Sequence, residues 1–263
     1  MLLRATGLRK DYTRGGWLSR KRTRVEVLRD VNLEIRSCST VALIGASGSG
    51  KSTLARCLAC LEKLDSGEIW FANENLAGFN PRELAPYRSQ IQLIFQEPSA
   101  SLNPRFTAVD LVSEPLVIAG VGTQSERRDR ALDQMELVGL PANLGNRLPS
   151  ELSGGQRRRL AIARALTLEP RLLILDEALT GLDLSTRAQI SNLLLNLQEV
   201  FSLTYLLISH DFGLVTHLAD EVVVLYGGRI VEGGAPELVG KAKQPWDSRA
   251  QTLNASRMTV GCQ

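Results

Sequence analysis

The sequence predicts an α/β fold in which a parallel or mixed β-sheet is covered by helices on both faces. Apolar segments of strand length alternate along the chain with segments of helical period, and a longer helical stretch interrupts this alternation. A glycine-rich turn joins one of the short strands directly to the next helix. The chain has 263 residues, of which 44% are hydrophobic and 22% charged, so it can bury one large core.

The first forty residues predict strands and turns, which we interpret as an N-terminal antiparallel β-subdomain. Residues 25–35 alternate apolar and polar side chains over much of their length, as a half-buried strand does. Residues 13–24 are rich in glycine, arginine and lysine. They predict a solvated loop, although such a charge run could also touch phosphate or lipid.

A short apolar strand over residues 40–44 leads into the glycine-rich turn, and the helix that follows carries a predicted apolar face. Its side chains at i, i+3, i+4 and i+7 are Leu54, Cys57, Leu58 and Leu61. The CxxC spacing of Cys57 and Cys60 could belong to a redox or zinc site, but the pair lies well inside the predicted helix and no second ligand pair follows. We therefore predict that both thiols pack as small hydrophobic groups.

The rest of the chain completes the predicted core around an insertion. Residues 98–149 have a helical pattern with several prolines, and they predict an inserted helical subdomain that extends to about residue 165. The other expected elements are strands over residues 69–72, 91–95, 172–175 and 205–208, helices over residues 125–138 and 185–199, and a hairpin over residues 221–232 around Gly227-Gly228.

Charge, cysteine content and hydropathy exclude several classes of protein. Lys plus Arg number 31 and Asp plus Glu number 28, a net charge of +3 that is too small to indicate nucleic-acid binding. Four cysteines are too few for a disulfide scaffold and fit a reducing compartment. No apolar run approaches the roughly 18 to 20 residues that span a bilayer, and the N-terminus has no signal-peptide core. We expect a soluble, cytoplasmic protein.

Residues 45–52 (GASGSGKS) fit the pattern G-x-x-x-x-G-K-[ST] between a predicted strand and a predicted helix. Glycines let successive backbone N–H groups wrap phosphate oxygens, Lys51 would reach the β- and γ-oxygens, and Ser52 would ligate Mg²⁺. A glycine-rich turn without a ligand is the alternative, and the strand–loop–helix context disfavours it. The predicted nucleotide-binding residues are Gly45, Ser47, Gly48, Ser49, Gly50, Lys51, Ser52 and Thr53.

The predicted buried strand at residues 172–175 ends in two adjacent carboxylates, Asp176 and Glu177. Asp176 can hold Mg²⁺ through its water shell, and Glu177 can polarise an attacking water as a general base. Taken alone, the two acidic residues could instead cap a helix. Beside a phosphate-binding loop, we favour the catalytic interpretation.

A second anion-binding helix end is predicted at residues 152–156 (LSGGQ), which lead into an arginine-rich helix. One chain thus has two predicted helix N-termini that could bind phosphate, which suggests that the one at residues 152–156 binds the nucleotide of another molecule. With this motif, the chain resembles the ATP-binding subunits of ABC transporters over roughly residues 1–240, with a tail at residues 241–263. The resemblance implies a P-loop NTPase core and an ATP site completed from a partner by Ser153, Gly154, Gly155 and Gln156.

Further family motifs can be carried over residue by residue. Gln96 matches the glutamine that contacts Mg²⁺ and the attacking water, and His210 matches the histidine that contacts the γ-phosphate. Asp183 matches an aspartate at the dimer interface, and Tyr12 matches the aromatic residue that stacks on adenine, although it could be an ordinary strand tyrosine. Gly181 departs from the usual family pattern before Asp183, which puts the details of that interface in doubt. The three arginines after residue 156 could form a nucleic-acid patch, but we place them on the outer face of their helix, where the family has polar residues.

Residues 95–105 (FQEPSASLNPR) closely resemble the same stretch in importers of dipeptides, oligopeptides and nickel, which also share the insertion at residues 13–24. Some subunits of that group carry a cysteine cluster for an iron–sulfur centre near the C-terminus. Here the tail holds Cys262 alone, so we predict no cluster.

The resemblance implies an ATP- and Mg²⁺-dependent ATPase on the cytoplasmic face of the inner membrane, energising import of peptides, nickel or a related small solute. The implied partners are transmembrane permease subunits, a second ATPase subunit of the same or a related chain and, indirectly, an extracytoplasmic solute-binding protein. Nucleic acid is not an expected partner. An ABC exporter subunit and a soluble ABC ATPase acting on nucleic acid or ribosomes are the alternatives.

Overall fold

The computed structural model describes residues 1–14, 23–96 and 102–239. Three predicted segments lie wholly or partly outside the described residues. They are the tail at residues 241–263, most of the loop at residues 13–24, and part of residues 95–105, which resemble the importers. The chain divides into two compact units. The first unit contains residues 1–36, 40–78 and the chain from residue 210 onward, and the second contains residues 37–39 and 79–209.

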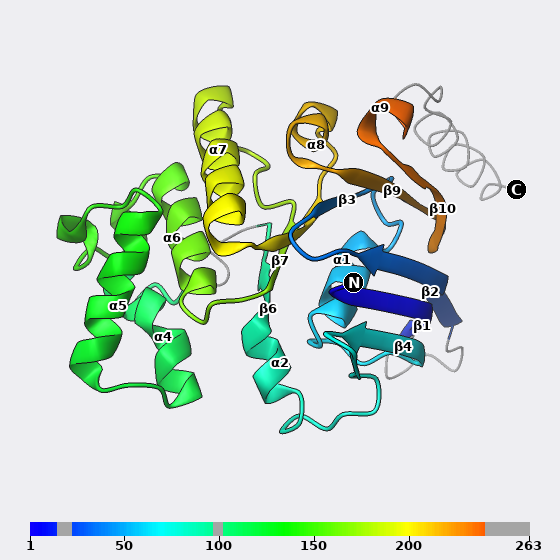
Figure 1. Ribbon diagram of the computed structural model, residues 1–263, viewed down its shortest axis with the longest axis horizontal. Coiled ribbons are helices and arrows are strands. Elements are labelled where there is room, and N and C mark those ends of the chain that lie inside the picture. The colour runs from blue at the N-terminus through cyan, green and yellow to red at the C-terminus, as the bar shows by residue number, and fades with distance from the viewer. Residues whose placement is uncertain (15–22, 97–101, 240–263) are drawn as a thin grey trace, which may run out of the picture. The chain divides into compact units, whose positions relative to one another are not determined.

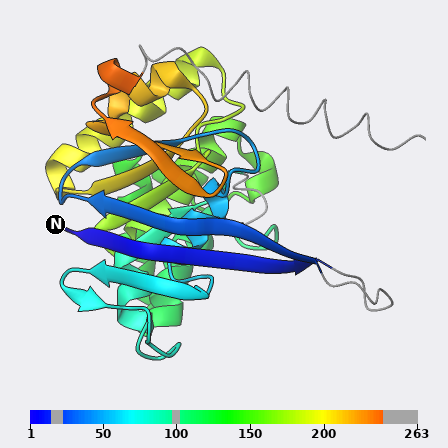
Figure 2. The same cartoon turned by 90° about the vertical axis from the view of Figure 1, so that its right-hand side faces the viewer.

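A four-stranded antiparallel sheet forms part of the first unit, with its long strands side by side in Figure 2. Its strands, in spatial order, are β2 (Thr23–Ile35), β1 (Leu3–Arg14), β4 (Ser66–Phe71) and β5 (Glu74–Asn75). Val31, Leu33 and Ile35 of β2 are buried, as the predicted alternation requires, and Leu28 is also buried, on the other side of a register shift between β1 and β2. The predicted antiparallel β-subdomain is therefore present.

The other strands of the first unit are β3 (Thr40–Ile44), β9 (Glu221–Tyr226) and β10 (Arg229–Gly234). Strand β3 is buried along its whole length and pairs in parallel with β9, which pairs with β10 as a hairpin. Gly227 and Gly228 both have positive φ, +55° and +81°, which a two-residue hairpin turn of this kind requires. The helices are α1 (Lys51–Leu58), α8 (Phe212–Leu218) and α9 (Pro236–Val239).

Helix α1 is shorter than the sequence predicts. It ends at Leu58, and Cys60 has φ +56°, a left-handed conformation that stops the helix. Cys60 therefore lies beyond the helix and not inside it as predicted, and Leu61, which the periodicity placed on the apolar face, is 52% exposed. Cys57 is buried as predicted, and burial raises the pKa of its thiol to about 12, as expected for a packed rather than a reactive cysteine.

The second unit contains three parallel strands in the order β8, β7, β6. They are β6 (Ile91–Ile94), β7 (Leu172–Asp176) and β8 (Thr204–Ile208). Every residue of β7 and β8 is buried, which explains why both read as continuous apolar runs rather than alternating ones.

The helices of the second unit include the predicted helical insertion, in which α4, α5 and α6 pack on one another (Figure 1). The helices of the second unit are α2 (Ala85–Gln90), α4 (Ala108–Ala119), α5 (Gln124–Leu137), α6 (Gly154–Leu166) and α7 (Leu184–Phe201), with short 3₁₀ turns η1 (Ala142–Leu144) and η2 (Pro149–Glu151). Thr107 and Thr123 begin α4 and α5 with capping boxes. In the part of the chain that the structure describes, no helix has the length and apolar character to cross a bilayer.

Candidate active site

The predicted phosphate-binding loop lies in the first unit between β3 and α1, and two of its glycines are required by close backbone contacts. A Cβ on Gly45 would lie 2.1 Å from the carbonyl oxygen of Leu225 in β9, and the φ of Gly45 is +153°. A Cβ on Gly50 would lie 3.0 Å from the carbonyl oxygen of Val27 in β2, with φ +108°. The loop is therefore held against two strands at points where only glycine fits.

The interior of the loop carries a cation and an unsatisfied hydroxyl. Lys51 is 7% exposed, and its Nζ donates to the carbonyl oxygens of Gly45 at 2.8 Å and Ala46 at 3.1 Å. The buried Oγ of Ser49 has no hydrogen-bond partner among the described residues. A Cβ on Gly48 would meet nothing within 4 Å. An ammonium group, an orphaned hydroxyl and open space beside the loop suit a phosphate group.

The first turn of α1 continues this loop. Ser52 is half-buried and Thr53 is 7% exposed, whereas Ser47 at the tip of the loop is exposed. The Ser52 hydroxyl supplies the kind of hard oxygen that Mg²⁺ accepts as a ligand.

The acidic pair of the second unit marks the end of β7. Asp176 is the last residue of the strand and is 6% exposed, and Glu177 follows it with φ +50°. The backbone N–H of Glu177 donates to the carbonyl of Ile208 at 3.0 Å, which ties this turn to the end of β8. A non-glycine residue in the left-handed region stores strain, and such residues cluster at functional sites.

The LSGGQ motif forms the start of α6, in which Ser153 and Gln156 make a reciprocal capping box. The Ser153 Oγ accepts from the Gln156 backbone N–H at 3.2 Å, and the Ser153 N–H donates to Gln156 Oε1 at 2.8 Å. Because the hydroxyl acts as an acceptor in this cap, its own proton stays available for a phosphate oxygen. Gly154 has open space at its Cβ position.

Asp183 begins α7 as its N-cap and accepts from the backbone N–H of Thr186 at 2.9 Å. The hydrogen bonds from Thr186 hold the pKa of the Asp183 carboxyl below its usual value. The methyl group of Thr186 also lies 2.8 Å from the position that a Cβ on Gly155 would take, so the LSGGQ turn packs against the start of α7. Gly181, the departure noted in the sequence, has φ +77°, which glycine adopts without strain.

Gln96 is exposed two residues after the end of β6, and its carbonyl accepts a hydrogen bond from Arg158 at 2.9 Å. His210 is exposed two residues after the end of β8. Tyr12, His210 and the phosphate-binding loop belong to the first unit, and the other predicted site residues belong to the second.

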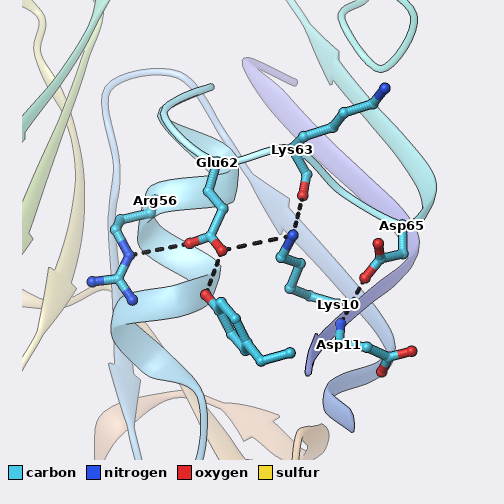
Figure 3. Close-up of polar contacts among 7 residues, drawn as sticks. Lys10, Asp11, Arg56, Glu62, Lys63 and Asp65 are labelled. Atoms are coloured by element: carbon cyan, nitrogen blue, oxygen red, sulfur yellow. Dashed lines mark hydrogen bonds and ion pairs between the residues drawn. The ribbon is translucent and has the colours of Figure 1, made fainter. Parts of the chain in front are cut away.

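Tyr12 on β1 is anchored by a polar cluster that sequence reasoning missed. Its hydroxyl donates to a carboxylate oxygen of Glu62, and Glu62 also lies 3.3 Å from Arg56 and 3.7 Å from Lys10 (Figure 3). The Lys10 ammonium is 5.5 Å from the centre of the Tyr12 ring. The i, i+2 spacing of Lys10 and Tyr12 places both on one face of a strand, but nothing in the sequence indicates the contact with Glu62, fifty residues away.

Comparison with known proteins assigns the family. The family model described as ABC transporter matches residues 28–180 of the chain. The chain belongs to this family. The resemblance read from the sequence and the predicted fold class are both confirmed, and the subunit is an ABC ATPase cassette.

Several curated relatives of this ABC cassette are named for peptide transport. It is 42% identical over 238 residues to the dipeptide transport ATP-binding protein DppF of Haemophilus influenzae, covering 90% of this chain and 73% of that one. It is 41% identical over 239 residues to DppF of Escherichia coli, covering 90% and 71%. A putative peptide import ATP-binding protein of Brucella ovis is 42% identical over 247 residues, covering 93% and 76%.

Solved ABC cassettes share the fold. The cassette MJ0796, in a dimeric post-hydrolysis state bound to ADP and Pi, is 31% identical with a TM-score of 0.80, covering 89% of this chain and 99% of that one. CbiO1 of Clostridium perfringens, part of the transporter complex CbiONQ, is 28% identical with a TM-score of 0.77, covering 98% and 96%.

The close contact at Gly45 gives a first prediction. Gly45→Ala forces the backbone away from Leu225 and should lower the free energy of unfolding by about 3 kcal/mol or more, whereas Gly48→Ala should cost only the left-handed penalty of about 1 to 2 kcal/mol. Denaturant unfolding without nucleotide measures both. Equal losses in the two variants would contradict the steric account.

Proposed function

We propose that this ABC cassette hydrolyses ATP to drive the import of peptides across a membrane. The observation that carries the ATPase assignment is the glycine loop curved around the Lys51 ammonium beside the orphaned Ser49 hydroxyl. Peptide is the proposed cargo because the three curated relatives described above are named for dipeptide or peptide transport or import. None of those three names mentions nickel, so nickel import stays a prediction from the sequence.

ATP binding begins in the first unit. We assign the phosphates to the backbone N–H groups of the loop, to Lys51 and to the Ser49 hydroxyl, and the adenine to the ring of Tyr12. The hydrogen bond to Glu62 restricts rotation of this ring, which reduces the entropy lost when a base stacks on it.

Hydrolysis depends on residues that follow the ends of β6, β7 and β8. Glu177 would accept a proton from the attacking water, Gln96 would orient that water, and His210 would donate to the γ-phosphate. The hydroxyl of Ser52, the carboxylate of Asp176 and the amide oxygen of Gln96 are the hard donors that Mg²⁺ prefers. When bound, Mg²⁺ supplies positive charge that neutralises the β- and γ-oxygens.

A second ATPase subunit would complete each ATP site in trans. The residues assigned to this role are Ser153, Gly154, Gly155, Gln156 and Asp183. Ser153, Gly154 and Asp183 are exposed, and the neighbouring Leu184 is a large apolar side chain with 79% of its surface exposed. An exposed leucine beside two capped helix starts suits an interface that closes on another chain, and the similar cassette MJ0796 is a dimer.

The permease subunits would dock in a groove of the second unit, of about 420 Å³, formed by α2, β6, α4 and α6. Its lining includes Phe95, Ile118 and Ala165, together with Arg88 and with Arg164, which is paired with Glu114 at 2.7 Å. Ile118 is 78% exposed. An apolar groove of this kind suits a short cytoplasmic helix that presents an apolar face. This docking would hold the cassette at the cytoplasmic face of the membrane, with the solute-binding protein acting on the permease from the other side.

The loop lysine provides a direct test of the ATPase assignment. Because Lys51 supplies the side-chain cation of this loop, Lys51→Ala should lower the rate of ATP hydrolysis by at least about 10²-fold. Phosphate release by the purified protein measures this. Near-normal turnover would refute the loop as the active nucleotide site.

Two variants separate the roles in cis and in trans. Glu177→Gln keeps the shape of the side chain but removes its basicity, so ATP should bind and stay unhydrolysed. This variant should therefore accumulate as a closed dimer with ATP bound. Ser153→Arg should keep ATP binding by the monomer and block closure, because a bulky side chain fills the approach to the partner's nucleotide. Light scattering with ATP or ADP, combined with ATP titrations, checks both. Parent-rate hydrolysis by the Glu177 variant, or lost monomer binding in the Ser153 variant, would overturn the respective role.

The groove gives a prediction about coupling. Ile118→Asp places a charge on the apolar lining and should lower ATP-driven transport by about tenfold or more, while the isolated subunit keeps its ATPase rate. Val200→Asp, at an exposed apolar position on α7, is the matched control and should transport normally. Uptake by reconstituted transporter is the measurement. Equal transport by both variants would exclude this groove as the docking site.

A further inference from the structure

Helix α6 carries three successive arginines, at positions 157–159, which we predicted to lie on the outer face of the helix. For Arg158 this prediction is wrong. Arg158 is 5% exposed, whereas Arg157 and Arg159 are half-buried. The helical rotation of 100° per residue turns the middle side chain toward the sheet. A buried arginine needs a structural explanation because burying a charge is costly.

The contacts of Arg158 join two loops that carry predicted catalytic residues. Its Nη1 donates to the carbonyl of Gln96 at 2.9 Å and to that of Phe95 at 3.4 Å, directly after β6. Its Nη2 donates to the carbonyl of Thr180 at 3.3 Å, in the loop between β7 and α7. The backbone N–H of Thr180 donates in turn to the carbonyl of Glu177 at 3.1 Å. A single guanidinium group therefore connects Gln96 to the turn that holds Glu177.

The neighbouring arginines make different contacts. Arg157 donates to the carbonyls of Pro149 and Leu152, at 3.2 and 2.9 Å, in the turn before its own helix. Arg159 donates to the carbonyl of Val138 at 2.7 Å and to the side chain of Gln189 at 3.3 Å. In the described structure, Arg158 alone among the three reaches the loops after β6 and β7.

The buried charge of Arg158 restricts movement of the two loops that it connects. Burial lowers the pKa of its guanidinium, no described carboxylate pairs with it, and its Nε is buried without a partner among the described residues. The carbonyl dipoles of the two loops are the groups that stabilise the charge. Moving either loop away would leave a buried cation with fewer acceptors, so the planar fork favours one relative position of the two loops.

We propose that Arg158 is a positioning residue that fixes Gln96 relative to Glu177, so that the hydrolytic step depends on it more than ATP binding does. This proposal rests on the proposed roles of Gln96 and Glu177. Because Arg158 connects the start of α6 to both catalytic loops, displacement of any one of these three segments should displace the other two.

The test compares Arg158→Met with Arg159→Met, which makes the same change one residue along the helix. For Arg158→Met, kcat for ATP should fall at least about tenfold while the dissociation constant of ATP changes less than about threefold. Arg159→Met should stay within about threefold of the parent in both. Equal losses in the two variants, unchanged kcat in Arg158→Met, or loss of ATP binding together with turnover would overturn the proposal.

A double-mutant cycle with Gln96→Ala tests the route of the effect. If Arg158 acts by placing the Gln96 side chain, the loss caused by Arg158→Met should be at least about threefold smaller in the Gln96→Ala background. The same loss in both backgrounds would overturn the positioning role. If Arg158→Met does not fold, Arg158→Gln, which keeps an amide donor for one of the two loops, is measured with the same expectations.

The outcome can be separated from failure of the proposed function. Active Lys51→Ala and Glu177→Gln variants would refute the ATPase site itself. A fully active Arg158→Met variant, in a protein that Glu177→Gln inactivates, would overturn only the inference about Arg158.

Discussion

The close approach of two strands to the loop after β3 is the constraint on which the site depends. The Leu225 carbonyl of β9 occupies the space that a side chain at Gly45 would need, and the Val27 carbonyl of β2 limits Gly50 in the same way. Parallel pairing of β3 with β9 holds this arrangement in place. The backbone therefore curves tightly enough to surround the Lys51 ammonium, and α1 begins where the curve ends.

In the second unit, a few side chains each contact more than one helix N-terminus or loop after a strand. Thr186 completes the cap of α7 at Asp183 and also packs against Gly155 at the start of α6. Arg158, one turn further along α6, reaches the loops after β6 and β7. Within this unit, Gln96 and Glu177, which are proposed to act on the subunit's own nucleotide, and the residues proposed to act on the partner's nucleotide are thus parts of one packed body.

Much of the fold could be predicted because its signals are local. The alternation in β2, the buried apolar runs of β7 and β8, and the Gly227-Gly228 turn each follow from short-range periodicity or turn chemistry. The end of α1 could not be predicted in this way, because the apolar spacing continued to Leu61 while the left-handed backbone at Cys60 ended the helix.

The local structure of the candidate site was predictable wherever one short motif carries its own geometry, as in residues 45–52 and 152–156. Contacts between distant segments were not. The hydrogen bond from Tyr12 to Glu62 spans fifty residues, and a row of three arginines does not show which one turns inward. Burial of Arg158 is decided by the carbonyls of Gln96 and Thr180, whose loops lie 62 and 22 residues away along the chain.

The contact between Gly155 and Thr186 has a consequence for how the two glycines of the LSGGQ turn are interpreted. A methyl group at position 155 would lie 2.8 Å from the methyl group of Thr186 of the same subunit and would force that side chain to move, so the second glycine has a steric reason within a single chain. A methyl group at position 154 would meet nothing. The first glycine is therefore spatially unconstrained within its own subunit, and any intolerance of a side chain there reports what approaches from outside.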